Sequence, residues 1–491
     1  MLFRRDRSNV WGSSLVVAIT LLAARPATTR ADAIGLSELR AAEPSLTGAG
    51  VAVAQPEAAY NAAETYEVNP AYTGVDQPAS LFTYISDLGT AATFPNSVGF
   101  ESGHADSVAT NFYGLNSGVA PGVSSVDNYL ADTFISNYIA TLTPIRAQVV
   151  NQSFIANDTP ANLQALNDAY DNYVATYGTI IVSAVGNGGQ VNSPATAYNV
   201  IGVADDDGGS STGPTSDGRS KPDITAPGGA TSFSTPFVSG AAALLVQAGQ
   251  QGYGGASPAT EAAAVDPRTV KALLLNGAVK PAGWTHTPTA PLDPNSGAGV
   301  LNIYNSFLQL QAGQHSASST SATPSVGGAH PAVAGGNIGS LAGWNLATLT
   351  SSGAADAYNN YVFALPSGPS SYSLTSTLVW QRPDGASDSD PINNFYLYLY
   401  NMTNSLASPI DLSDSTLDNV QQLYDLGLTP GDTYDIEVFK TGGTLDDPGV
   451  ISYTDTYALA FDFAPVPEPG SAAALLFTAL TLLVARGSRP C

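Results

Sequence analysis

Cysteine and basic residues are scarce in this sequence. Of its 491 residues only Cys491, at the last position, is a cysteine, so no disulfide can form within the chain. There are 16 Lys and Arg against 40 Asp and Glu, which gives a formal net charge of −24. A surface this acidic repels phosphate backbones, which excludes nucleic acid as a partner. The hydrophobic content of 44% supports a folded chain, and the length predicts two domains with processing segments at the ends.

The first 33 residues have the pattern of a secretory signal peptide. Arginines between Arg4 and Arg7 form a basic start, an apolar stretch follows from Leu15 to Ala24, and Ala31 to Ala33 is a small-x-small cleavage site. The apolar stretch is short for spanning a membrane, which argues against the alternative of an N-terminal anchor. The sequence therefore predicts export, and export without disulfides excludes a small disulfide-stapled domain.

The C-terminus, residues 465–491, carries a second targeting pattern. Val466 to Gly470 reads VPEPG, an apolar run extends from Ser471 to Ala485, and Arg486 and Arg489 follow. This order resembles the PEP-CTERM sorting signal of Gram-negative bacteria. The resemblance implies recognition by exosortase-type machinery, transient membrane association through the apolar helix, removal of the tail, and a secreted or surface-associated product. A plain C-terminal membrane anchor is the alternative.

Residues 221–240, KPDITAPGGATSFSTPFVSG, centre on Ser232. Their glycines predict a tight turn that presents this serine immediately before a helix, with Pro236 in the helix's first turn and Phe237 to Val246 as its buried part. Free N–H groups at a helix start favour the negative charge that develops when a serine attacks a carbonyl. The alternative is a helix cap without chemistry.

These residues resemble the serine motif of the subtilisin-like serine proteases (subtilases), GTSMAxPHVAG, and KPDITAPG resembles the segment before it. The sequence departs from the motif at Ala230 and Phe237, and almost no loop separates APG from the serine. The resemblance implies that Ser232 is the nucleophile of a peptidase that works through an acyl-enzyme.

Two further blocks resemble the same family in the same order. GHADSVATNFYGLNSGVAPG, residues 103–122, resembles the histidine block and places His104 on the catalytic histidine. AVGNGG places Asn187 on the side-chain amide of the oxyanion hole. Without the resemblance, His104 reads as a surface histidine and Asn187 as part of an Asn-Gly turn.

The block that supplies the family's orienting aspartate is altered here. In LTGAGVAVAQPE the aligned residue is Gln55, and Glu57 lies two positions further on. Residues two apart on a strand share a face, so either side chain is a candidate for holding His104. The alternative for Glu57 is a solvated carboxylate in a loop.

The hydrophobic pattern predicts two domains. Apolar strands at 147–154, 179–185 and 199–204, with a helix from Asp158 to Tyr177, predict a parallel sheet flanked by helices. We expect a subtilisin-like peptidase domain at 34–310, and no inhibitory prodomain before it. A Ser/Ala/Gly-rich linker at 311–337 leads to alternating strands at 338–464, which predict an all-β sandwich or jelly roll similar to pre-peptidase or P-type domains.

Asp205, Asp206 and Asp207 follow one of the predicted strands. The pattern favours a solvated acidic loop, with calcium as the alternative occupant because its ligands are oxygens. No other cofactor or metal is expected. Tyr and Trp of the β-domain are interpreted as strand packing, with glycan or protein docking as the alternative.

Two functions remain open at this point. The first is a secreted serine endopeptidase in which Ser232, His104 and Asn187 act with Gln55 or Glu57. The second is a catalytically impaired pseudoprotease that binds peptides or glycans at the cell surface. The altered acid position is the feature that separates them.

Overall fold

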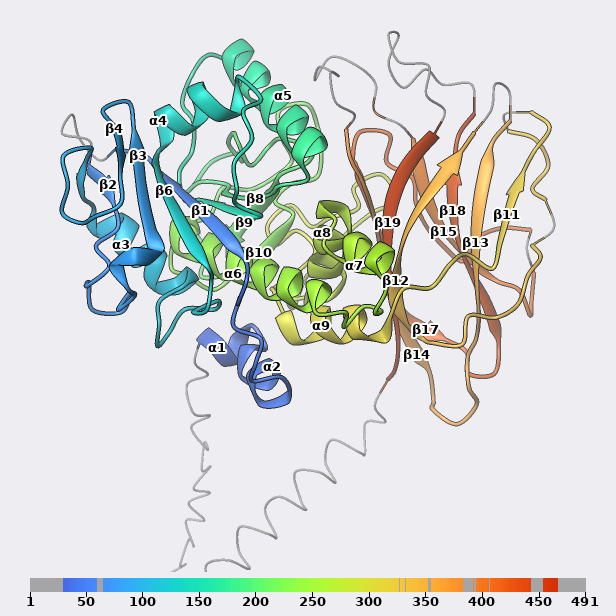
Figure 1. The fold of residues 1–491 in the computed structure, drawn as a ribbon. Coiled ribbons are helices and arrows are strands. Elements are labelled where there is room, and N and C mark those ends of the chain that lie inside the picture. The colour runs from blue at the N-terminus through green and yellow to red at the C-terminus, as the bar shows by residue number, and fades with distance from the viewer. Residues whose placement is uncertain are drawn as a thin grey trace, which may run out of the picture.

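The computed structural model describes residues 30–59, 65–325, 327–331, 333–351, 355–382, 392, 394–405, 407–442 and 454–466. The expected signal peptide and sorting signal fall almost wholly outside the described residues. Figure 1 shows a helix-covered sheet beside a second, all-β part, as the sequence predicts. In the described part of the chain, no helix has the length and apolarity needed to cross a membrane.

The first sheet runs in the order β10-β9-β8-β7-β1-β6-β3-β4. Its neighbouring strands pair in parallel except β4, which is antiparallel to β3. The strands are β1 (Ala52–Glu57), β3 (Phe82–Ser86), β4 (Gly89–Ala91), β6 (Ser125–Leu130), β7 (Val149–Gln152), β8 (Ile180–Ala184), β9 (Ile201–Asp205) and β10 (Ile224–Ala226). A small parallel pair, β2 (Thr65–Glu67) with β5 (Phe100–Glu101), lies beside this sheet.

Helices cover both faces of this sheet, and the strand residues divide between the two faces. Val149 and Val182 belong to the core under one face, whereas Val150 and Ile181 belong to the core under the other. This division follows from the two-residue repeat of a strand, and it explains why the central strands are apolar throughout. The longer helices are α3 (Gly103–Phe112), α5 (Pro160–Tyr177), α6 (Thr231–Gln250), α8 (Pro267–Asn276) and α9 (Ile303–Ala312). The shorter helices are α1 (Arg30–Ala33), α2 (Leu36–Ala42), η1 (Ala79–Leu81), α4 (Ala131–Phe134), η2 (Ile135–Ile139) and α7 (Pro258–Ala264).

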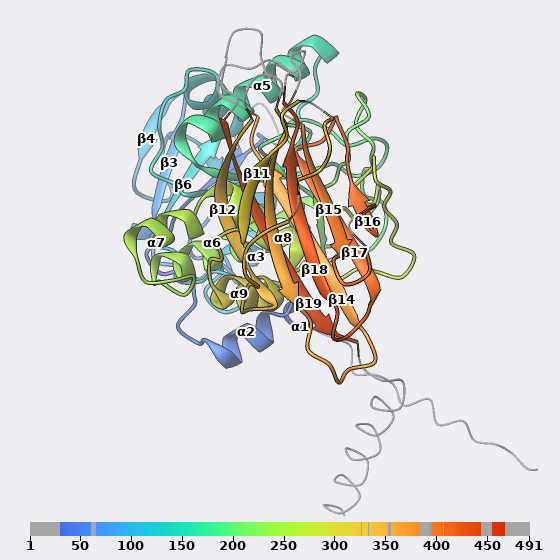
Figure 2. The same cartoon turned by 90° about the vertical axis from the view of Figure 1, so that its right-hand side faces the viewer.

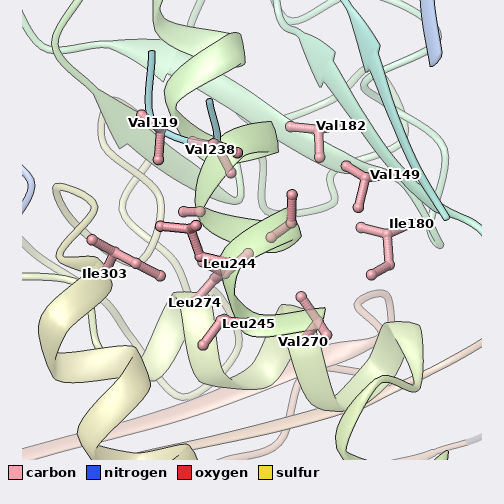
Figure 3. Packing of buried hydrophobic residues seen from close by; sticks show 14 of the residues in the cluster. Val119, Val149, Ile180, Val182, Val238, Leu244, Leu245, Val270, Leu274 and Ile303 are labelled. Carbon is pink, nitrogen blue, oxygen red and sulfur yellow. The ribbon is translucent and has the colours of Figure 1, made fainter. Parts of the chain in front are cut away.

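Helix α6 lies at the centre of the larger core. Figure 3 shows Val238, Leu244 and Leu245 of this helix surrounded by side chains of the sheet and of α8 and α9. Every residue from Ser234 to Gly249 is buried, which matches the apolar run in the sequence. The prediction for the helix start was wrong, because α6 begins at Thr231. Ser232 therefore lies in the first turn of the helix rather than in a turn before it, and Pro236 lies in the second turn.

The all-β part consists of two antiparallel sheets packed on each other (Figure 2). Their orders are β11-β13-β18-β15-β16 and β12-β19-β14-β17. The strands are β11 (Ser319–Ala322), β12 (Ala342–Thr350), β13 (Ala357–Ala364), β14 (Tyr372–Trp380), β15 (Phe395–Asn401), β16 (Asp411–Ser413), β17 (Val420–Leu428), β18 (Thr433–Lys440) and β19 (Thr454–Pro465). The sandwich fold is thus confirmed, but the segment expected as a linker contains β11, which pairs with β13 and joins the sandwich.

The two parts of the chain share a packed boundary. Helix α8 lies against β14 and β19, and α9 lies against β12. Buried polar contacts cross the same boundary. The Thr377 hydroxyl donates to Asn276 Oδ1 at 2.9 Å, and the Arg382 backbone N–H donates to Asn199 Oδ1 at 2.9 Å. The sandwich is therefore fixed to the helices by both apolar and polar contacts.

Candidate active site

The carboxyl ends of three neighbouring strands bring the predicted site residues to one edge of the sheet. Strand β1 ends at Glu57, β7 leads into Ser153, and β8 leads through a short turn to Asn187. Helix α6 begins at the same edge, because Ser153 contacts Ser232 and Asn187 contacts Thr231. The carboxyl edge of a parallel sheet is the usual place for a binding site in open α/β folds.

His104 and Glu57 form a direct pair. The Nδ1 atom of His104 lies 2.9 Å from Glu57 Oε2, with the histidine side chain 36% exposed and the glutamate 1% exposed. Ser102 caps helix α3 by accepting from the Ala105 N–H at 3.3 Å, which fixes the helix start that carries His104. The alternative of a solvated loop carboxylate is wrong, because Glu57 is the buried last residue of strand β1.

Gln55 lies behind this pair and makes no hydrogen bond to His104. Its Nε2 donates to Glu57 Oε1 at 2.8 Å and to the Ala105 carbonyl at 3.0 Å, while its Oε1 accepts from the Tyr113 hydroxyl at 2.5 Å. Of the two candidates for the acid position, Glu57 thus contacts the histidine and Gln55 orients Glu57. A neutral amide suits this place, since a second buried carboxylate would repel Glu57.

Pro56 separates these two residues on the strand. Strand β7 pairs with β1 only at Val53 and Ala54, so beyond Ala54 one side of β1 has no ladder partner. Proline lacks the N–H needed for a ladder hydrogen bond and is tolerated where pairing has ended. The end of the β7 ladder therefore coincides with the start of the site.

The surroundings of His104 favour its charged form. Burial lowers the pKa of His104, but the hydrogen bond that His104 donates to Glu57 and the charge of Glu57 act in the opposite direction, and the pKa ends above its usual value. The Phe233 ring packs against the imidazole with 5.6 Å between ring centroids. The pair is thus arranged to stabilise an imidazolium.

Ser232 is held through its backbone as well as its side chain. Pro236 has no N–H to donate to the Ser232 carbonyl four residues earlier, and the Ser153 hydroxyl donates to this carbonyl instead, at 2.8 Å. The Ser232 hydroxyl donates to the Ser153 carbonyl at 3.3 Å. Within the described residues no hydrogen bond joins this hydroxyl to His104, and such bonds commonly form only when a substrate is bound.

Asn187 is fixed by its side-chain oxygen. Its Oδ1 accepts from the Thr231 backbone N–H at 2.9 Å and from the Thr231 hydroxyl at 3.0 Å. Gly186 and Gly188, with φ of 102° and 101°, allow the turn that carries it. The Asn187 side chain is exposed, and in the described part of the chain its Nδ2 hydrogens have no protein acceptor. This amide therefore has a donor available for a ligand oxygen.

Asp205 is a positioning residue, a role that the acidic pattern in the sequence did not indicate. Its side chain is 5% exposed, and Oδ1 accepts from the Gly229 N–H and from the Ser234 hydroxyl, both at 2.8 Å. It thus ties the turn before Ser232 to the first turn of α6. Carboxylate oxygens of Asp205, Asp206 and Asp207 lie within 4.8 Å of one another, but only Asp205 is buried. The expectation of a wholly solvated acidic loop was therefore wrong for Asp205.

Ser153 and Tyr113 were also missed as positioning residues. Ser153 lies near the end of the strand expected at 147–154, whereas Tyr113 reaches Gln55 across 58 positions in the sequence. A local sequence pattern cannot predict a contact between two residues that lie so far apart in the chain.

One protein family matches this region of the chain. Residues 89–304 match the model of the subtilase family, Peptidase S8. This segment includes His104, Asn187 and Ser232, while Gln55 and Glu57 precede it. Over these residues the sheet-and-helix part of the chain is therefore similar to the serine peptidases of the subtilase family.

Several solved structures are similar to this chain. The prenylagaramide maturation protease PagA is 23% identical, covering 56% of this chain and 98% of that chain with a TM-score of 0.40. A mutant of the protease domain of PatA is 25% identical, covering 54% and 98% with a TM-score of 0.39. A lanthipeptide protease is 15% identical, covering 57% and 94% with a TM-score of 0.42.

Proposed function

We propose that this protein is a secreted serine endopeptidase in which Glu57 takes the place of the orienting aspartate. The observation that carries the proposal is the 2.9 Å contact between His104 Nδ1 and the buried carboxylate of Glu57. With Nδ1 occupied, His104 has Nε2 available to accept the proton of Ser232. The raised pKa of His104 supports this role, because the protonated imidazole is an intermediate in the reaction.

The reaction uses each residue at a stated atom. Ser232 Oγ attacks the peptide carbonyl as His104 takes its proton, and the carbonyl oxygen becomes negative. Asn187 Nδ2 and the Ser232 backbone N–H, at the start of α6, donate to that oxygen. His104 then gives the proton to the leaving amine as the peptide C–N bond breaks, which leaves an ester between the acyl group and Ser232 Oγ. Water attacks this ester as His104 takes its proton, and His104 returns the proton to Ser232 Oγ as the ester bond breaks.

Labelling with a fluorophosphonate probe tests this function. The probe forms a covalent bond with an activated serine, so we expect labelling of the purified protein and its loss in Ser232→Ala. Ser136→Ala, at an exposed position, is the matched control and should label like the parent. No labelling above the Ser232→Ala background, in protein shown to be folded by circular dichroism, would favour the pseudoprotease instead.

The proposed location is extracellular. Its support lies in the sequence at 1–33 and 465–491, with exosortase-type machinery as the partner that removes the tail. Mass spectrometry of the extracellular product is the test. Recovery of a product that still contains Cys491 would contradict the sorting proposal.

A further inference from the structure

A cavity of about 510 Å³ opens along helix α3 next to His104. Its floor includes Ser107 and Asn111, which lie three and seven residues after His104 and therefore on the same face of the helix. Its wall includes Phe233, whose ring packs against His104. The cavity thus lies on the same helix face as the histidine of the proposed catalytic site and shares the Phe233 ring with it.

The short connection before Ser232 creates this space. Gly228 and Gly229 line the cavity with backbone alone. A Cβ on Gly228 would lie 2.3 Å from Ser234 Oγ, and Gly229 has a φ of 81°, so both positions favour glycine. Because almost no residues separate the APG segment from α6, this connection itself forms no loop over the opening.

The position of His104 indicates which part of a peptide substrate would enter this cavity. A histidine that takes the serine's proton passes it to the leaving amine, so the leaving segment must lie on the histidine side of the serine. Asn187 is tied to Thr231, whereas the cavity is lined by Phe233, whose ring packs against His104. The cavity therefore lies where the residues after the cleaved bond would be.

The chemistry of the lining defines the side chain that fits. Tyr72 and Phe233 supply aromatic surface, Thr73 and Ser107 supply hydroxyls, and none of the described lining residues is charged. We propose that this cavity binds the residue that follows the cleaved bond and selects a large uncharged side chain, above all an aromatic one. The assignment to a leaving group rests on the proposed peptidase function, whereas the binding itself does not.

Equilibrium binding to the Ser232→Ala protein tests the proposal without turnover. The ligands are the dipeptide amides Phe-Ala, Gly-Ala and Lys-Ala, titrated by proton NMR; their free amino group corresponds to that of the leaving segment. Burial of the ring and contact with Tyr72 and Phe233 should make Phe-Ala bind about 10-fold more tightly than Gly-Ala. Equal affinity of the two, or tighter binding of Lys-Ala, overturns the proposal.

Two variants localise the effect. Tyr72→Ala removes an aromatic wall and should reduce the preference for Phe-Ala about 3- to 5-fold. Tyr177→Ala is the matched control, since Tyr177 is 38% exposed against 39% for Tyr72 and lies outside the cavity. Ser107→Phe, with Ser136→Phe as its control, should fill the cavity and abolish the preference. An unchanged preference in both cavity variants would place the binding elsewhere and refute the assignment.

The labelling experiment separates the two proposals. Labelling of Ser232 together with no Phe-Ala preference leaves the peptidase standing and overturns the cavity. A Phe-Ala preference without labelling supports the cavity as a peptide-binding site and removes its role for a leaving group.

Discussion

The protein contains two similar histidine–glutamate pairs, one in each part of the chain. In the peptidase domain a 36% exposed His104 meets a 1% exposed Glu57, and in the sandwich a 27% exposed His330 meets a fully buried Glu437. In each pair the glutamate closes or lies within a strand and the histidine belongs to another segment. The pair alone therefore does not define a catalytic site.

The two pairs differ in what surrounds the second glutamate oxygen. Glu57 Oε1 accepts from Gln55, so the first pair is satisfied on both sides. In the described part of the chain, Glu437 Oε1 has no hydrogen-bond partner, and neither does Oδ2 of the neighbouring buried Asp435. His330 is flanked by Tyr358 and Tyr400 rather than by a serine. A fully hydrogen-bonded glutamate beside a nucleophile distinguishes the proposed catalytic pair from the structural one.

Replacing each glutamate by glutamine should give the largest difference between the pairs. Glu57→Gln removes the charge that stabilises the imidazolium, and we expect the rate of fluorophosphonate labelling to fall roughly 10³-fold, since amide replacement of a triad carboxylate costs about 10⁴ in a related case. Glu437→Gln is the matched control and should label within about twofold of the parent. Equal rates for all three proteins would show that Glu57 has no part in activating the serine.

Gln55→Leu should weaken the first pair by a smaller amount. This change leaves Glu57 in place but removes the donor to its Oε1 and leaves the Tyr113 hydroxyl without its buried acceptor. We expect the free energy of unfolding to fall by about 1–3 kcal/mol and the labelling rate to fall about 10-fold. Urea unfolding and labelling rates measure the two effects. A variant with unchanged labelling would mean that Glu57 keeps its orientation without Gln55.

The sandwich pair should also make the stability of the folded protein depend on pH, and we expect this effect to be smaller than the two before it. Burial, followed by the charge of Glu437, raises the pKa of Asp435 well above its ordinary value, and burial raises that of Glu437. The folded state thus holds protons that the unfolded state releases above about pH 4, so stability falls as pH rises through this window. The hydrogen bond to Glu437 raises the pKa of His330, whose stabilising contribution is present below about pH 6.5 and is likewise lost as pH rises.

Asp435→Asn checks this interpretation. The amide cannot ionise and can donate to a neighbouring acceptor, so we expect Tm to rise by about 2 °C at pH 8, with little change at pH 4. Thermal unfolding followed by circular dichroism at the two pH values is the measurement. A larger gain at pH 4 than at pH 8 would contradict the assigned direction of the pKa shifts.

The sequence predicted those parts of the site that depend on local pattern. Apolar runs located β7, β8 and β9, and the motif around Ser232 located the start of α6 to within a few residues. The two-residue repeat of a strand placed Gln55 and Glu57 on one face, but it did not tell which one meets His104. That choice depends on the Ala105 carbonyl and the Tyr113 hydroxyl, which take up the amide of Gln55. These contacts exist only after α3 has packed on the sheet.

The dependence on contacts between distant segments also explains the other differences between prediction and structure. The segment around Ser319 was predicted to be a linker because its small polar residues show no alternation of apolar and polar positions. Its pairing as β11 depends instead on a free edge of strand β13, which lies elsewhere in the chain. Asp205 was interpreted by its two acidic neighbours, whereas its burial results from α6 packing above it. Contacts between distant segments decide such cases.

The core around α6 does not end at the peptidase domain. Trp344, Val379, Val420, Ala458 and Ala460 of the sandwich belong to the same continuous cluster as the buried residues of α6, α8 and α9. A chain cut before β12 would therefore expose part of this cluster to water and be prone to aggregate. Removing the β-sandwich would take away part of the core on which α6 packs, so we expect both parts to stay together when the chain is processed.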